Sequence, residues 1–117
     1  MVTTDEQVTP NYPCDQRTAP TKLTIPTGTA TSQAIQVGHF RTGLLSSGSG
    51  VVGPYTFTAS LTKAGTYRVV QGASVTKSAD NTWHAIPDIV MKAGWIKVVD
   101  SNGNVTGDQT IEVILKT

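Results

Sequence analysis

The chain has 117 residues, enough for one domain built around a single modest hydrophobic core. Nine basic and eight acidic residues nearly cancel, which argues against a long-range field that gathers nucleic acid. The single cysteine, Cys14, has no partner for an internal disulfide and forms no zinc-binding spacing with the two histidines.

Threonine is abundant in the sequence, and charged residues are scarce. Nineteen residues are Thr, whereas charged residues make up 15 % of the chain. The β-branched Thr side chain favours strands over helices, and low charge favours a surface that neighbours cover. No segment approaches the roughly 18 consecutive apolar residues of a membrane span. The polar start also lacks the basic and apolar parts of a signal peptide.

Residues 1–20 differ in character from the rest of the chain. Three prolines interrupt both helix and central strand, and the apolar residues Val2, Val8 and Tyr12 follow no period. The sequence therefore predicts an extended N-terminal arm at 1–20 and a folded domain at 21–117.

The conformational entropy lost when such an arm becomes ordered opposes its binding to a partner. Fixing 20 residues opposes it by about 20 to 40 kcal/mol, whereas full burial of the three apolar side chains returns about 5 to 8 kcal/mol. We therefore expect a partner to hold the arm, through backbone hydrogen bonds at the edge of a sheet. Val2, Val8 and Tyr12 are its predicted contact residues.

Strand patterns begin after residue 20. In the first half of the chain they cover residues 23–25, 34–37, 40–45 and 55–61. A polar turn joins the first two of these strands, and residues 46–50 have the composition of a mobile loop. The clearest alternation places four residues of the last strand on one face: Tyr55, Phe57, Ala59 and Leu61.

The second half of the chain continues the pattern. Residues 66–71 predict a strand, which Gly72 separates from a weaker candidate at 73–77. A turn at Asp80-Asn81 precedes residues 83–86, and Pro87 opens a single helical turn through 89–91. Two apolar segments, 94–99 and 110–115, are expected to be central strands that pair as a closing hairpin. Short strands at roughly 8 to 12 residue spacing predict an all-β fold, an antiparallel β-sandwich or jelly-roll.

The segment 100–104 begins like a calcium loop, with oxygen-bearing side chains at alternate positions. Val105 stands where such a loop needs glycine, however, and the bidentate acid is missing. Asn102-Gly103 is a strong turn signal. A structural turn is therefore the preferred interpretation, with no metal or other cofactor. We expect the isolated domain to fold as a monomer or trimer without metal.

No catalytic pair emerges from the titratable residues. His39 and His84 lie far apart in sequence, and neither has an acid-containing motif beside it except the distant Asp88. The chain is therefore not expected to be an enzyme.

Three aromatic residues are candidate contacts for a sugar or a protein partner: Tyr67, Trp83 and Trp95. Trp95 stands in a strongly apolar segment, so we expect it in the core. Trp83 stands in a polar stretch and is the predicted contact residue of the folded domain, because large aromatic residues are enriched at interfaces.

Several segments resemble small virion proteins of tailed phages. The resemblance begins with Leu-Thr-Ile-Pro-Thr-Gly-Thr-Ala-Thr-Ser-Gln-Ala-Ile at 23–35 and continues through Gly-Leu-Leu at 43–45 and Phe-Thr-Ala-Ser at 57–60. It ends on the apolar strands 95–99 and 111–115, and so covers roughly residues 22 to 117. Between Leu45 and Tyr55 the sequence departs from the pattern, because Ser-Gly-Ser-Gly replaces an apolar, tryptophan-bearing segment.

Phage proteins of this kind are often capsid decoration (cement) proteins, which are jelly-roll or sandwich domains that sit as trimers on the shell. The resemblance implies a virion structural protein on the capsid surface that bridges and stabilises capsid subunits. Its partners would be the major capsid protein and neighbouring copies in a homotrimer, with no nucleic acid or membrane partner. The alternative is a receptor- or glycan-binding tip domain of a tail or fibre, with Trp83 and Tyr67 as contacts.

Overall fold

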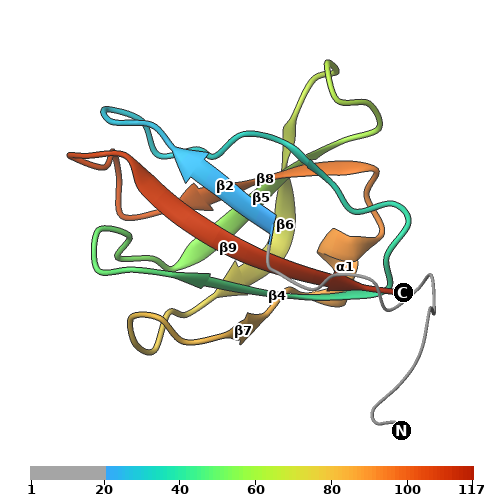
Figure 1. Ribbon diagram of the computed structural model, residues 1–117. Helices are drawn as coiled ribbons and strands as arrows, with labels where there is room; N and C mark the ends of the chain where they lie inside the picture. Colours follow the sequence, from blue (N-terminus) through green and yellow to red (C-terminus); the bar gives the residue numbers. More distant parts are fainter. Residues whose placement is uncertain (1–20) are drawn as a thin grey trace, which may run out of the picture.

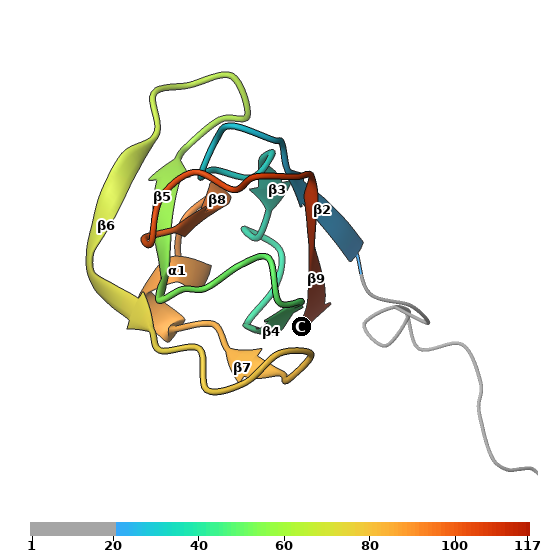
Figure 2. The ribbon, with the colours of Figure 1, turned by 90° about the vertical axis from the view of Figure 1, so that its left-hand side faces the viewer.

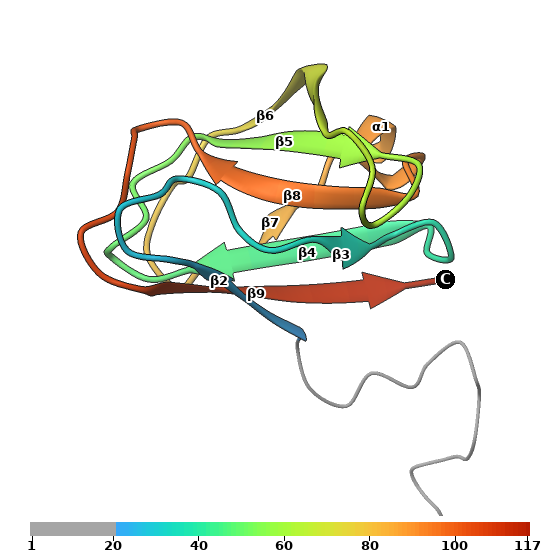
Figure 3. The same cartoon turned by 90° about the horizontal axis from the view of Figure 1, so that it is seen from above.

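The computed structural model describes residues 21–117, which form two antiparallel four-stranded sheets (Figure 1). The strand order of the first sheet is β2 (Thr21–Ile25), β9 (Gln109–Lys116), β4 (Thr42–Ser47), β7 (His84–Ala85). The order of the second sheet is β3 (Ile35–Gln36), β8 (Trp95–Asp100), β5 (Tyr55–Ser60), β6 (Arg68–Val75). The sheets lie face to face, as Figure 3 shows. The predicted β-sandwich is therefore confirmed, while the predicted arm at 1–20 lies outside the described residues.

One helical turn, α1 (Asp88–Met91), connects β7 to β8 at the position predicted from Pro87. Pro87 precedes the helix with a φ of −57°, the backbone angle that its ring fixes. Val90 and Met91 are buried, so α1 adds apolar side chains to the core. No helix in the described part of the chain is long and apolar enough to cross a membrane.

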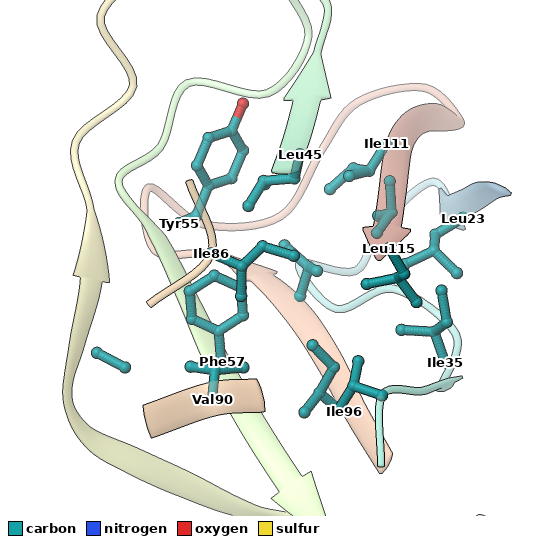
Figure 4. Packing of buried hydrophobic residues seen from close by; sticks show 14 of the residues in the cluster. Leu23, Ile35, Leu45, Tyr55, Phe57, Ile86, Val90, Ile96, Ile111 and Leu115 are labelled. Carbon is teal, nitrogen blue, oxygen red and sulfur yellow. The ribbon is translucent and has the colours of Figure 1, made fainter. Parts of the chain in front are cut away.

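Side chains from both sheets and from α1 meet in one apolar cluster, shown in Figure 4. Tyr55 and Phe57 are fully buried in this cluster, as their alternation predicts. Full burial of such a side chain contributes about 1.5 to 3 kcal/mol. Leu61 was expected on the same face, but 90 % of its surface is exposed, because β5 ends at Ser60 and the chain turns away.

The expected closing hairpin of β8 and β9 is wrong. Both strands are central, as predicted, but β8 pairs with β3 and β5, whereas β9 pairs with β2 and β4. Each strand buries every second residue, and both buried faces point into the same core. The two strands therefore pack across the sandwich, and residues 101–108 pass from one sheet to the other.

The strands β2 and β3, predicted to be joined by a polar turn, also belong to different sheets. Their connection runs beside the one between β8 and β9. The N–H of Gly28 donates to the carbonyl of Val105 at 2.9 Å, and the N–H of Val105 donates to the carbonyl of Thr29 at 2.8 Å. These two long connections thus bind each other at one end of the sandwich.

The predicted mobile loop at residues 46–50 is shorter than expected. Ser46 and Ser47 belong to β4 and are buried. Ser47 faces the core, where its hydroxyl forms a hydrogen bond with the phenol of Tyr55. Gly50 also has close neighbours, since a Cβ built on it would lie 2.1 Å from the side chain of Gln109. Residues 46–50 are thus the end of a strand followed by a tight turn, which their composition alone does not distinguish from a mobile loop.

Gly72 does not separate two strands, as had been predicted. β6 continues through it, and the pairing of β6 with β5 shifts register between Thr56 and Thr58. Gly72 has a φ of 82°, which glycine adopts readily and other residues rarely do. The glycine thus permits a bulge inside one continuous strand.

Candidate functional site

Of the four predicted contact residues, the structure describes only Trp83. This residue lies just before β7, at the edge of the first sheet, and 41 % of its surface is exposed. The ring is accessible at the surface, and its role as a contact stays a prediction. Val2, Val8 and Tyr12 lie outside the described residues.

Trp95 is not a core residue, contrary to the expectation. It is half-buried on the outward face of β8, because Ile96 and Val98 take the inward positions of that strand. Tyr67 lies on the same outer face, where the side chain of Lys97 covers its ring. Two of the three candidate aromatic residues therefore share one face of the second sheet.

Trp83 is remote from that face. Its neighbour His84 contacts the ring of Tyr55, the first residue of β5. Tyr67, by contrast, follows the turn that begins after Ser60, the last residue of β5. The three aromatic residues therefore do not form a common platform.

Four residues form an aromatic–lysine cluster on the outer face of the second sheet: Lys63, Tyr67, Trp95 and Lys97. The Lys97 ammonium lies 4.3 Å from the centre of the Tyr67 ring, and the Lys63 ammonium lies 5.8 Å from the Trp95 ring. Both distances are within the range of cation–π attraction. The phenol of Tyr67 donates a hydrogen bond to the carbonyl of Lys63 at 2.8 Å. Burial raises the pKa of this phenol, so it remains a neutral donor.

The cluster presents positive charge on this outer face. A sugar that stacked on either covered ring face would first have to displace an ammonium group. Lys63 and Lys97 were not among the predicted residues. One signal for Lys97 is present in the sequence, because Trp95-x-Lys97 places both side chains on one face of a strand.

The first sheet carries an apolar hollow of about 460 Å³ on its outer face. Leu44 and Ile114, which are cross-strand partners, line it together with Ala85. Asp88 and Lys116 also line it. An apolar hollow with charged groups beside it suits contact with another protein surface.

Four strands lie at sheet edges. β3 and β7 have two residues each, and β2 has five. β6 has eight, and 71 % of the surface of its Val69 is exposed. A long edge strand offers unpaired backbone groups to another chain. Within the part of the chain that the structure describes, β6 is thus the longest edge strand, and a bulge interrupts its pairing with β5.

The carboxylate of Asp100 is buried, and three backbone N–H groups donate to it. They belong to Gly53 at 2.9 Å, Asn102 at 3.0 Å and Val52 at 3.2 Å. The N–H of Gly103 donates to the carbonyl of Asp100 at 3.2 Å, which confirms the predicted turn. Among residues 21–117, no group of three or more His, Cys, Asp or Glu side chains is placed to hold a metal ion.

Chelator is expected to leave the melting temperature of the chain unchanged, because the oxygens of Asp100 already accept backbone hydrogen bonds. Differential scanning calorimetry with and without EDTA tests this, with added Ca²⁺ as the reciprocal measurement. A drop of more than about 4 °C on chelation, or roughly 1 kcal/mol for a domain of this size, would restore the calcium interpretation.

Two described titratable side chains, His84 and Asp108, accept hydrogen bonds within the fold. The N–H of Ser78 donates to Nε2 of His84 at 3.0 Å. The N–H and hydroxyl of Thr27 donate to Asp108 at 2.8 and 2.9 Å, and these bonds hold the pKa of the carboxyl below its ordinary value. The contribution of this pair to stability is lost as the pH falls through that lowered pKa.

The side chain of Lys77 is almost completely buried, with 5 % of its surface exposed. Its ammonium donates to the carbonyl of Gly48 at 2.7 Å and to the carbonyl of Val51, and it lies 2.8 Å from a carboxylate oxygen of Asp80. It therefore fixes the turn after β4 to the segment after β6.

Comparison of the chain with protein-family models, curated proteins and solved structures found no match in any of the three.

Proposed function

We propose that this chain is a non-enzymatic virion structural protein, a capsid decoration protein that bridges and stabilises capsid subunits. The observation that carries the proposal is the open eight-residue edge of β6, which offers backbone donors and acceptors to another protein chain. The resemblance of residues 22–117 to small phage virion proteins supports the virion as the location.

The mechanism is binding at the joints between subunits. Surface buried at a joint stabilises only the assembled shell, so decoration shifts the equilibrium toward assembly by mass action. The exposed Trp83 and the apolar hollow at Leu44 and Ile114 provide contact area for this purpose. The N-terminal arm would add further contacts.

A glycan-binding tip domain fits the geometry less well. That function was expected to use Trp83 and Tyr67 together, and they lie near opposite ends of β5. Lysine side chains also cover the rings of Tyr67 and Trp95. A glycan array tests this alternative, since only this function predicts a specific sugar.

Co-sedimentation with undecorated capsids tests the proposed function. Deletion of residues 1–20 is expected to preserve the circular dichroism spectrum of the fold and to weaken attachment to the shell.

Trp83→Ala is expected to weaken attachment to the shell at least about tenfold, because buried tryptophans dominate interfaces.

Leu61→Ala is the matched control, because Leu61 is 90 % exposed and is not a predicted contact. If the truncated chain binds shells as tightly as the full chain, the arm is a passive tail. If the full chain does not bind shells at all, it is not a decoration protein.

A further inference from the structure

The edge of β6 has properties that call for a partner strand. Its one strand neighbour is β5. No residue of β6 exchanges a backbone hydrogen bond with a turn or loop in the described chain. β6 is eight residues long and exposes Val69. Its bulge leaves residues 68–69 and 74–75 as the two stretches that pair regularly with β5. Arg68, at the first position, is the one charged residue of β6.

The chain itself contains a segment that matches this edge. Residues 2–9, with the sequence Val-Thr-Thr-Asp-Glu-Gln-Val-Thr, number eight and lie between Met1 and Pro10. Five of the eight are β-branched, and none is proline or glycine. Pro10 cannot donate a backbone hydrogen bond, so it would end strand pairing at that point.

Charge favours the same pairing. Asp5 and Glu6 stand near the middle of residues 2–9. Residues 55–79, which include β5 and β6, contain no acidic residue. Arg68 and the aromatic–lysine cluster therefore present positive charge at one end of β6. These opposite charges attract residues 2–9 toward this end of the second sheet.

We propose that residues 2–9 of a second copy of this chain add as a strand to the open edge of β6. β2, which begins where the N-terminal segment ends, lies on the opposite side of the molecule from β6 (Figure 2). In the same copy, residues 10–20 would have to pass around the sandwich with a reach of at most about 36 to 40 Å. A neighbouring copy has no such restriction.

This contact joins two different surfaces, so each copy donates one strand and accepts another. Such heterologous contacts close into rings when the rotation between copies permits, and a trimer is one such ring. The inference rests on the proposed function, for which it supplies the contact between copies. It is tested without shells, so the two can fail separately.

Analytical ultracentrifugation of the full chain at micromolar concentration is the first test, with an oligomer as the expected result. Thr4→Pro is expected to weaken association at least about tenfold, because proline removes a donor within the added strand. Asn11→Pro is the matched control, since it lies beyond residues 2–9, and it is expected to leave association unchanged.

A charge exchange tests the pairing independently of strand propensity. Arg68→Glu is expected to weaken association, and combining it with Asp5→Lys and Glu6→Lys is expected to restore it. Lys22→Glu, on the first sheet, is the control for net charge.

A monomeric full chain, or association that Thr4→Pro leaves unchanged, would overturn the proposal. Hydrogen exchange of the β6 amides then identifies the occupant of the edge. If the full chain is a monomer whose β6 amides exchange slowly, and they exchange rapidly in Thr4→Pro, the added strand is the chain's own segment and the proposal is wrong. Failure of shell binding with intact self-association would instead overturn only the proposed function.

Discussion

Replacing Asp100 with alanine is expected to lower the free energy of unfolding by about 3 kcal/mol. The substitution leaves three backbone N–H groups without an acceptor, and each buried donor left unpaired costs about 1 to 3 kcal/mol. Two of the three, on Val52 and Asn102, are only partly buried, which places the total near the low end of that sum. The corresponding drop in melting temperature is about 12 to 24 °C. Urea unfolding followed by tryptophan fluorescence measures the change.

Asp100→Asn separates the hydrogen bonds from the charge. Oδ1 accepts from Gly53 and Asn102, so an asparagine oxygen at that position keeps both bonds and loses only the longer one, to Val52. We expect a loss of about 1 kcal/mol. Asp108→Ala is the control, since this exposed carboxylate should matter much less. Equal effects of Asp100→Ala and Asp108→Ala would contradict the assigned role of Asp100.

Lys77→Met is expected to lower the free energy of unfolding by about 2 kcal/mol. Methionine keeps the apolar stem but leaves the carbonyls of Gly48 and Val51 without their donor. Asp80 is half exposed, so water can replace its lost partner. Asp80→Ala is accordingly expected to cost less than about 1 kcal/mol, as for an exposed ion pair.

Thermal unfolding of the two variants compares these effects directly. Lys97→Met, which removes an ammonium from an outer face, is the matched control for loss of positive charge. If Asp80→Ala were as destabilising as Lys77→Met, the ion pair rather than the two carbonyls would be the source of stability.

The sequence predicted which residues form strands better than it predicted which strands pair. An alternating pattern shows that one face of a strand is buried, but it does not name the neighbouring strand. β8 and β9 follow each other along the chain and were therefore expected to pair, yet both direct their buried faces into one core from opposite sheets.

The surface of the second sheet was predictable in part. Four of the five residues from Trp95 to Val99 are apolar, so the run alone does not say which face is buried. Lys97 indicates which face of the strand is exposed, because a lysine on the inner face would be costly to bury. The alternation then places Trp95 outside with Lys97. The bonds of Asp100 to Val52 and Gly53 could not be predicted, since these residues lie 48 and 47 positions away.

The connection between β5 and β6 differs from those at the other end of the sandwich. Its hydrogen bonds run only among its own residues, from Ser60 to Tyr67. At the opposite end, by contrast, the connections are bonded to one another through Gly28, Val105 and Asp108. Lengthening the chain between Ala64 and Thr66 therefore breaks no hydrogen bond between elements and leaves the contact of Lys63 with Trp95 in place. Evolution or engineering can vary the length of this connection, and a foreign peptide grafted there would be displayed on every copy without disturbing the core.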